Sequence, residues 1–223
     1  MSDLEAENER QSAKLRLQLI DGATQLNVKL NRAAEDKLMA YLQLLAKWNK
    51  VFNLTAIDDP QRVVSHHLLD CLAIAAFVRG SSVLDVGSGA GLPGIPLAIV
   101  LPEKRFVLLD SNGKKTRFLV QAVAELALTN VDVVNARVEK YKGDAAFDTI
   151  TARAFSRIEK LLDQSARLCD ASGCYLFMKG REPAQEIAEM AARFSVTSTH
   201  LLNVPGVEGQ RRLLIVEPAQ SKV

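Results

Sequence analysis

After residue 80, short apolar segments alternate with segments that have the apolar spacing of a helix. The apolar segments are rich in Val, Ile, Leu and Phe and have the length of buried strands. Such alternation implies right-handed crossovers and an α/β fold, with a mostly parallel sheet covered by helices on both faces. We predict strands at 83–86, 106–110, 131–136, 147–152 and 174–179, and helices at 93–101, 114–127, 157–169 and 184–193.

The C-terminal end of the chain breaks the alternation. Two strand-like segments, 198–204 and 211–217, are separated only by the loop PGVEGQ. A connection this short leaves no room for a crossover helix, so the two strands must run antiparallel. We therefore expect an antiparallel pair at one edge of the sheet.

The N-terminal part of the chain has a helical pattern instead. From residue 33 to residue 52 the apolar side chains recur at steps of three and four, and a second helical segment starts after Pro60. Residues 1–30 are polar, with four acidic residues and one basic residue in the first ten, and we expect them to form a flexible tail. The predicted organisation is a tail over 1–30, a helical cap over 31–80 and an α/β domain over 81–223, with cap and domain packed as one unit.

Charge and cysteine content narrow the function classes. The formal net charge is only +2, which does not by itself indicate a nucleic-acid-binding protein. The three cysteines include no C-x-x-C pair, so neither disulfides nor a metal site is expected. We see no N-terminal leader, and the apolar run at 72–78 is too short to cross a bilayer. These features predict a cytoplasmic protein with no membrane association.

A glycine-rich turn follows the first predicted strand. In VLDVGSGAGLPGIPLAI, residues 83–99, four glycines come directly after the strand, and Pro93 and Pro96 fall near the first turn of the next helix. Proline there costs little, because the amides of a first turn have no acceptor within the helix. Gly89 to Gly94 match G-x-G-x-x-G, but the match starts two residues later than a pyrophosphate-binding turn would favour. The pattern predicts a rigid ligand-binding turn at the carboxyl edge of the sheet.

Two aspartates indicate what the ligand is. Asp110 ends the second strand, where a carboxylate can accept hydrogen bonds from both ribose hydroxyls of NAD or of S-adenosylmethionine. Asp85 lies two residues before the first glycine, and its charge suits the cationic amino-acid part of S-adenosylmethionine better than a pyrophosphate. The alternative for Asp85 is that it only caps the turn.

Several blocks together resemble the RsmG family, also called glucose-inhibited division protein B. They are KWNKVFNLT at 47–55, HHLLD at 66–70, GSGAGLPGIPLAI at 87–99, LLDSNGKKTRFL at 108–119 and RAF at 153–155. The resemblance covers about residues 35–217 and implies a class I S-adenosylmethionine-dependent methyltransferase of Rossmann-like fold. Family members methylate N7 of guanine 527 in 16S ribosomal RNA. The implied partner is 16S ribosomal RNA or a precursor of the small ribosomal subunit, and no stable protein partner is implied.

Matching the family's motifs to this sequence gives the candidate cofactor-binding residues. Arg153, after the fourth strand, is also a candidate for positioning the target. Basic residues near later strand ends are candidates for phosphate contacts with RNA: Lys114, Lys115, Arg117, Lys179 and Arg211. The cofactor set is Gly87, Gly89, Leu92, Asp110, Val138, Glu139 and Arg153.

The implied chemistry requires no catalytic base. Guanine N7 carries a lone pair and no proton at neutral pH, so it can attack the methyl group directly once the two are aligned. No cysteine follows a proline, as a cytosine C5 methyltransferase would need, and TARAF stands where an exocyclic-amine methyltransferase would have an N/D-P-P-[YF] block. We therefore assign no catalytic residue.

The sequence leaves open the roles of three residues and two alternative functions. His67 and Asp70 either shape the pocket floor or belong to the core, and we favour the core for His67 and for Trp48. An NAD(P)-dependent oxidoreductase would share the sheet and Asp110 but needs a proton donor that we do not find. A ribosome-assembly factor without turnover would share the RNA-binding features.

Overall fold

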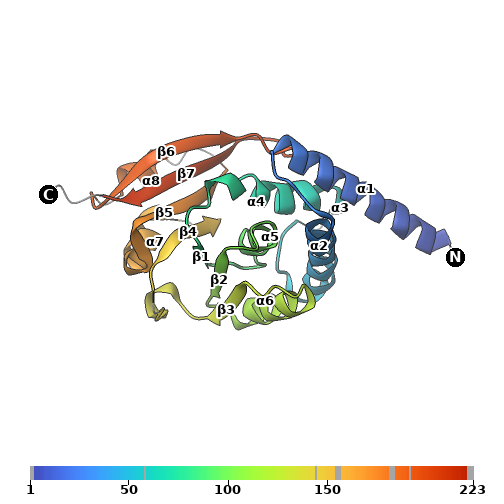
Figure 1. Ribbon diagram of the computed structural model, residues 1–223, viewed down its shortest axis with the longest axis horizontal. Helices are drawn as coiled ribbons and strands as arrows, with labels where there is room; N and C mark the ends of the chain where they lie inside the picture. The colour runs from blue at the N-terminus through green and yellow to red at the C-terminus, as the bar shows by residue number, and fades with distance from the viewer. Residues whose placement is uncertain are drawn as a thin grey trace.

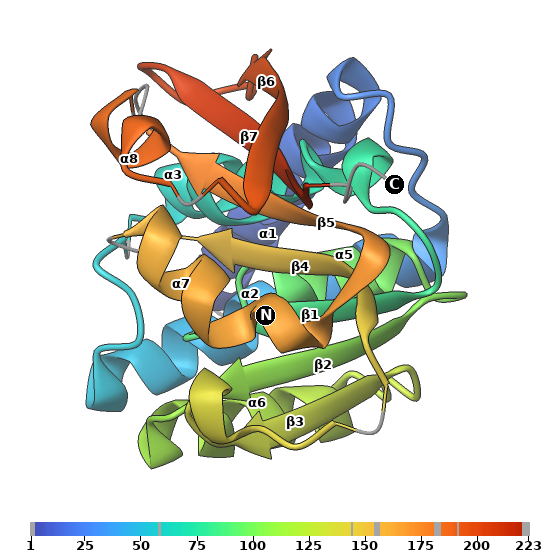
Figure 2. The same cartoon turned by 90° about the vertical axis from the view of Figure 1, so that its left-hand side faces the viewer.

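A seven-stranded sheet forms the centre of the molecule. In the computed structural model, the described residues are 3–57, 59–143, 145–153, 157–180, 184–190 and 192–219. Within them the strand order is β3-β2-β1-β4-β5-β7-β6, visible from bottom to top in Figure 2. All neighbouring pairs are parallel except β5 with β7 and β6 with β7. The strands are β1 Ser82–Val86, β2 Arg105–Asp110, β3 Val131–Asn135, β4 Phe147–Arg153, β5 Cys169–Lys179, β6 Phe194–Leu202 and β7 Arg211–Pro218.

The predicted parallel sheet with an antiparallel edge pair is confirmed. The largest difference is at β5, which begins at Cys169 rather than at residue 174. Cys169 already pairs with Phe147 of β4, and the register then shifts before Thr149. Helix α7 therefore ends at Ser165, earlier than predicted, because the chain must return to the sheet.

Helices cover both faces of the sheet, as Figure 1 shows, with α7 on the left-hand face and α2, α4 and α5 on the other. Side chains alternate along β1, so Val83 packs in the core beneath α2, α5 and α6, whereas Leu84 packs in the core beneath α7. The helices of the sheet region are α5 Gly94–Val100, α6 Gly113–Glu125, α7 Ile158–Ser165 and α8 Ala184–Ala188, with 3₁₀ turns at Val138–Lys140 and Ala166–Leu168.

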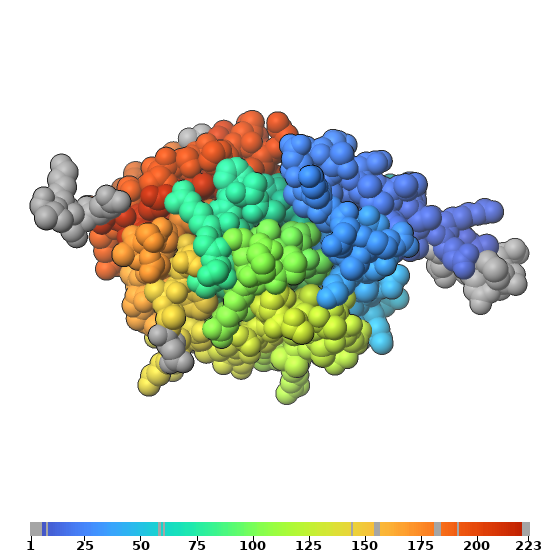
Figure 3. All heavy atoms as spheres, viewed as in Figure 1, coloured from blue at the N-terminus to red at the C-terminus, as the bar shows by residue number. Residues whose placement is uncertain are grey.

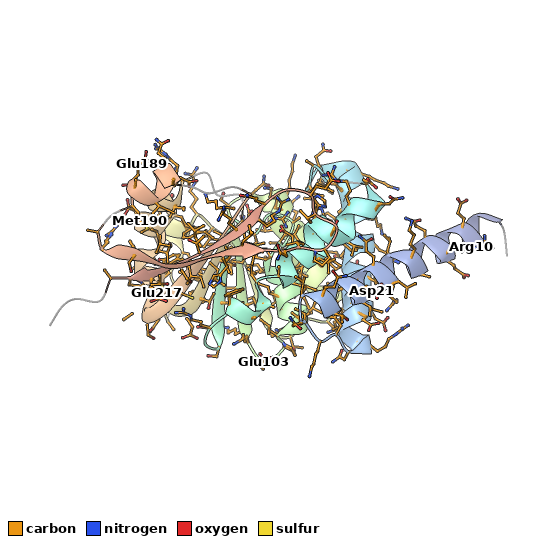
Figure 4. All side chains as sticks on the ribbon, turned by 90° about the horizontal axis from the view of Figure 1, so that it is seen from above. Arg10, Asp21, Glu103, Glu189, Met190 and Glu217 are labelled. Atoms are coloured by element: carbon orange, nitrogen blue, oxygen red, sulfur yellow. The ribbon has the colours of Figure 1, made fainter. Side chains whose placement is uncertain are left out.

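The N-terminal residues differ from the sequence-based expectation. Where a flexible tail was predicted over residues 1–30, the structure has helix α1, Asp3–Gln25. Its second half carries the buried side chains Leu19 and Ala23, which pack in the same core as the cap. Its first half projects beyond the body, as Figure 3 shows. In Figure 4, Arg10 lies along this projecting part and Asp21 lies where α1 meets the body. The apolar contact positions Leu15, Leu19 and Ala23 recur every fourth residue, but they lie in a mostly polar segment, and its polar composition favoured a tail.

The cap consists of α2, Arg32–Phe52, and a segment that runs from Pro60 to Leu72. That segment is helical, as predicted, but it is made of α3 Pro60–Val63, a π-helical stretch Val64–Leu69 and α4 Asp70–Leu72. A 3₁₀ turn, Ala75–Phe77, leads into β1. Cap side chains such as Leu45 and sheet side chains such as Val83 share one hydrophobic core. The division at residue 80 stays a prediction.

None of the helices in the described ranges combines the length and the apolar character that a membrane crossing requires.

Candidate functional site

A cleft lies at the carboxyl ends of β1, β2 and β3, where the sheet topology places ligands. Its volume is about 200 Å³. α7 contributes Lys160 and Gln164 to its wall. The lining residues are Val86, Gly87, Leu109, Asp110, Ser111, Ala136, Arg137, Val138, Glu139, Lys160 and Gln164.

The glycine turn after β1 is held by backbone hydrogen bonds. Gly87 has a φ of 70°, in the left-handed region that favours glycine, and its N–H donates to the carbonyl of Leu109 at 2.8 Å. From the cap, the Tyr41 hydroxyl donates to the carbonyl of Ala90 at 2.6 Å. The backbone of Gly87 therefore forms the cleft wall, and the cap buttresses the turn from the other side.

Asp85 holds the turn from beneath. Its side chain is fully buried, with one oxygen accepting from the N–H of Gly94 at 3.1 Å and the other from the Thr151 hydroxyl at 3.0 Å. Burial raises the pKa of the Asp85 carboxyl to about 6. Asp85 does not line the cleft, so the structure gives it the capping role that the sequence left as the alternative.

Asp110 faces the cleft at the end of β2. Its oxygens accept hydrogen bonds from the N–H of Gly89 at 2.9 Å and from the N–H of Asn112 at 2.8 Å. Each carboxylate oxygen has two acceptor sites, so both can still accept a hydroxyl hydrogen. The same contacts place Gly89 against Asp110 and fix Asn112, the N-cap residue of α6. The Asn112 side chain accepts a hydrogen bond from the N–H of Lys114 in the first turn of that helix.

The cleft brings together four of the seven residues predicted to bind the cofactor: Gly87, Asp110, Val138 and Glu139. Gly89 borders it through Asp110. Leu92 is 9% exposed and packs in the core under the cap rather than lining the cleft.

Sequence reasoning missed the remaining side chains of the cleft, chiefly Arg137, Lys160 and Gln164. Lys160 and Gln164 lie one turn apart on α7. That spacing is the only signal in the sequence that could have placed them on one face.

Arg153 lies at a second cleft, at the ends of β4 and β5 and the beginning of β7. This cleft has a volume of about 250 Å³. It also contains two of the predicted RNA-binding residues, Lys179 and Arg211. Its lining residues are Asp70, Arg153, Met178, Lys179, Gly180, Leu202, Arg211 and Arg212. The structure thus separates Arg153 from the other predicted cofactor-binding residues and groups it with basic side chains.

The π-helical stretch of the cap meets this second cleft. The N–H of Asp70 donates to the carbonyls of Ser65 and His67, whereas in an α-helix it would donate to that of His66. The carbonyl of His66 instead accepts from Nη2 of Arg153 at 3.2 Å. Nη1 of the same guanidinium lies 3.6 Å from Oδ2 of Asp70 and donates to the Cys71 sulfur at 3.5 Å. Arg153 therefore joins the cap to the sheet.

His67 is a core residue, as favoured from the sequence. It is 1% exposed, and its Nε2 lies 3.1 Å from the Thr55 hydroxyl oxygen. Burial lowers the pKa of His67 to about 4, so the imidazole is neutral near pH 7. This neutral, buried ring faces a threonine and lines neither of the two clefts.

The three cysteines are buried thiols. Burial raises the pKa of Cys71 and of Cys169 to about 12, and it also raises the pKa of Cys174. A nucleophilic cysteine has a lowered pKa and an exposed sulfur. None of the three can therefore act as a thiolate nucleophile at neutral pH.

The remaining predicted RNA-binding residues, Lys114, Lys115 and Arg117, lie in the first turns of α6. The Lys115 ammonium is nearest to the glycine turn, 3.9 Å from the position that a β-carbon on Gly89 would take. Arg117 borders a separate groove with Trp48. The Trp48 ring packs edge-on against Phe118 at 5.6 Å, which agrees with core packing.

Comparison with known proteins identifies close relatives. The family described as "rRNA small subunit methyltransferase G" matches residues 34–215. "Ribosomal RNA small subunit methyltransferase G" of Ectopseudomonas mendocina (strain ymp) is 52% identical over 201 residues, which are 89% of this chain and 94% of that protein. The protein of the same name from Marinobacter nauticus is 50% identical over 203 residues, 91% of this chain and 95% of that one.

Solved structures share the fold at low identity. Magnesium protoporphyrin IX methyltransferase from Synechocystis PCC 6803, solved with bound SAM, aligns with a TM-score of 0.58 and 13% identity over 80% of this chain and 97% of that one. TrmN from Thermus thermophilus aligns with a TM-score of 0.52 and 19% identity over 67% of this chain and 47% of that one. These similarities confirm the predicted Rossmann-like fold of class I methyltransferases.

Proposed function

The chain belongs to the rRNA small subunit methyltransferase G family, and from this premise we propose that it methylates N7 of guanine 527 in 16S ribosomal RNA with S-adenosylmethionine as donor. The family was expected from the sequence blocks, and the relatives confirm it. The observation that carries the proposed site is the cleft at the ends of β1 to β3, where Asp110 faces a glycine turn.

The residues of this cleft suit the donor. The Asp110 carboxylate has acceptor capacity left for the two ribose hydroxyls, and the backbone of Gly87 leaves room for close approach. Val138 and Glu139 line the side of the cleft where the adenine would lie. When bound, the donor supplies a methyl group on a positively charged sulfur.

The protein's task in the reaction is alignment. Because guanine N7 has a free lone pair, no group must remove a proton, and correct positioning can supply about 7 to 11 kcal/mol in favourable cases. The buried thiols and the neutral, buried His67 line neither cleft, so the proposal gives them no part in the reaction. We assign Arg153 to positioning, between the cap and the end of β4.

The RNA reaches the site over basic side chains. Lys114, Lys115 and Arg117 follow Asp110 in α6, and we propose that they contact phosphates beside the donor cleft. The substrate is 16S ribosomal RNA or a small-subunit precursor in the cytoplasm, with no stable protein partner and no membrane contact.

The experiment is incubation of the protein with labelled S-adenosylmethionine and 16S RNA, supplied naked, in partly assembled particles and in the whole small subunit. The label should map to N7 of guanine 527 in at least one of the three. Label at another base would contradict the proposed target. Absence of label from all three, with retained binding of the donor, would favour a ribosome-assembly factor without turnover.

A calorimetric titration with S-adenosylmethionine and with NAD tests the cofactor separately. Heat should appear with S-adenosylmethionine alone. Binding of NAD instead would favour the oxidoreductase.

A further inference from the structure

We propose that the second cleft, lined by Arg153, Lys179, Arg211 and Arg212, binds a phosphate group of the RNA strand that carries the target guanine. The proposal rests on the proposed function, because it assigns a subsite to the same RNA substrate. It also divides the predicted RNA-binding residues. Lys179 and Arg211 belong to this cleft, whereas the basic residues of α6 lie along a different part of the surface.

The charge of the cleft suits a phosphate. Of the lining side chains that the structure describes, four are cationic and Asp70 alone is anionic. Lys179 is also bound by Glu186, at 2.7 Å, so its charge is partly compensated. The remaining excess of positive charge on three arginines is what a phosphodiester requires, and the planar guanidinium group can donate two parallel hydrogen bonds to phosphate oxygens.

The cleft is shaped in advance by Asp70, whose side chain is 6% exposed. Its Oδ2 lies 3.6 Å from Nη1 of Arg153, and its Oδ1 lies 3.3 Å from Nε of Arg211. One buried carboxylate thus holds two arginines, one from β4 and one from β7, on the same side of the cap. Arginines held in this way lose less side-chain entropy when they bind an anion. Asp70 is accordingly a positioning residue.

The location also fits an RNA strand that passes the donor cleft. β4 lies next to β1 in the sheet, so the Arg153 end of the second cleft adjoins the strand that leads into the glycine turn. Gly180 has no side chain to fill the cleft, and a β-carbon there would lie 4.0 Å from Nη1 of Arg211. Met178, which is buried, and Leu202 form the apolar walls. A phosphate seated here would hold the strand beside the methyl donor without covering it.

The test measures RNA affinity against salt concentration for Arg211→Gln, with the RNA form that the wild-type protein methylates and with S-adenosylhomocysteine present. Loss of one phosphate contact should reduce the slope of log affinity against log salt by about 0.7. Between 50 and 200 mM salt, the wild type should therefore lose roughly threefold more affinity than the variant. Binding of S-adenosylmethionine should be unchanged, because Arg211 does not line the donor cleft.

Arg105→Gln is the matched control. Arg105 is a basic residue at the start of β2, whereas the second cleft lies at the carboxyl ends of β4 and β5, and its side chain is 72% exposed. The Arg105→Gln change removes the same charge from the protein, and the slope of log RNA affinity against log salt should stay at the wild-type value. Arg211→Lys, which keeps the charge, should recover the wild-type slope and so separates a lost contact from a folding defect.

The result that overturns the inference is an Arg211→Gln slope equal to that of Arg105→Gln. In that case the wild-type protein would still methylate guanine, so the proposed function would stand while this subsite failed. Failure of the wild type to methylate any form of the RNA would instead count against the function itself.

Discussion

Arg153 donates a hydrogen bond to the backbone carbonyl of His66 at 3.2 Å, across the boundary between the sheet and the cap. The His66 carbonyl belongs to the π-helical stretch, and Arg153 is the last residue of β4. π-helical turns inside helices are uncommon and are often found at functional sites. Here the turn couples the end of the fourth strand to the cap, so the position of Arg153 depends on both parts of the molecule.

Because Arg153 joins the sheet to the cap, we expect Arg153→Met to destabilise the protein. The change leaves the buried Asp70 with Arg211 as its one remaining ion-pair partner of the two described, so the free energy of unfolding should fall by about 2 to 3 kcal/mol, somewhat less than for a fully unpaired buried charge. Urea denaturation measures it. Adding Asp70→Asn should cost less than the sum of the single changes. Arg105→Met, which breaks the exposed pair with Asp132, is the control and should change stability by less than about 1 kcal/mol. Additive effects of the two changes would contradict the coupling.

Gly87→Val should abolish binding of S-adenosylmethionine, because the new side chain would occupy the wall of the donor cleft. Gly209→Val is matched in backbone strain, since Gly209 has a φ of 89° and an added β-carbon there meets no atom within 4 Å. Both variants should lose similar stability, and only Gly87→Val should lose the ligand. Isothermal titration calorimetry separates the two effects. Equal affinity in both variants would move the cofactor away from the glycine turn.

Asp110→Ala should weaken binding of S-adenosylmethionine by about 1 to 3 kcal/mol, the range for loss of a charged hydrogen-bond partner. If the carboxylate binds the ribose, adenosine should be weakened as much and adenine, which lacks the ribose, should not be affected. Competition binding of the two compounds measures the difference. The Asp110 carboxylate also accepts a hydrogen bond from the N–H of Gly89. An equal loss of affinity for adenine would mean that the change weakens binding by disturbing the glycine turn and not by removing a ribose contact.

Asp85 should make stability depend on pH. Its pKa is about 6 in the folded protein, raised by burial from 3.8, so the folded state holds an extra proton between these values. Its stabilising contribution is therefore fully present below pH 3.8 and is lost as the pH rises through 6. Relative to Asp85→Asn, the wild type should lose about 3 kcal/mol between pH 4 and 7. Thermal unfolding of both proteins across this range gives the difference, and a constant difference would show that Asp85 does not titrate in it.

The buried strands and the glycine turn could be predicted from the sequence because both depend on the local order of residues. Buried strands are continuous apolar runs, and Pro93, Pro96 and the glycines mark the turn into α5 wherever the rest of the chain lies. Asp110 could be placed at the cleft for the same reason, since a residue at a strand end must lie at the sheet edge. The start of β5 could not be read, because it depends on the pairing of Cys169 with Phe147, which are distant in sequence.

The sequence by itself determined the family, the α/β fold and the strand ends that face the donor, because each is carried by contiguous blocks whose chemistry acts through neighbouring residues. Only the tertiary structure decided which charges share a cleft. Asp70, Arg153 and Arg211 come from the cap, β4 and β7, and their ion pairs form where these three segments meet. The same holds for Asp85, whose position before the glycines suggested a ligand, whereas its burial against Gly94 and Thr151 makes it a support for the turn. Burial and charge pairing depend on contacts between segments that are distant in sequence, so the local sequence pattern does not predict them.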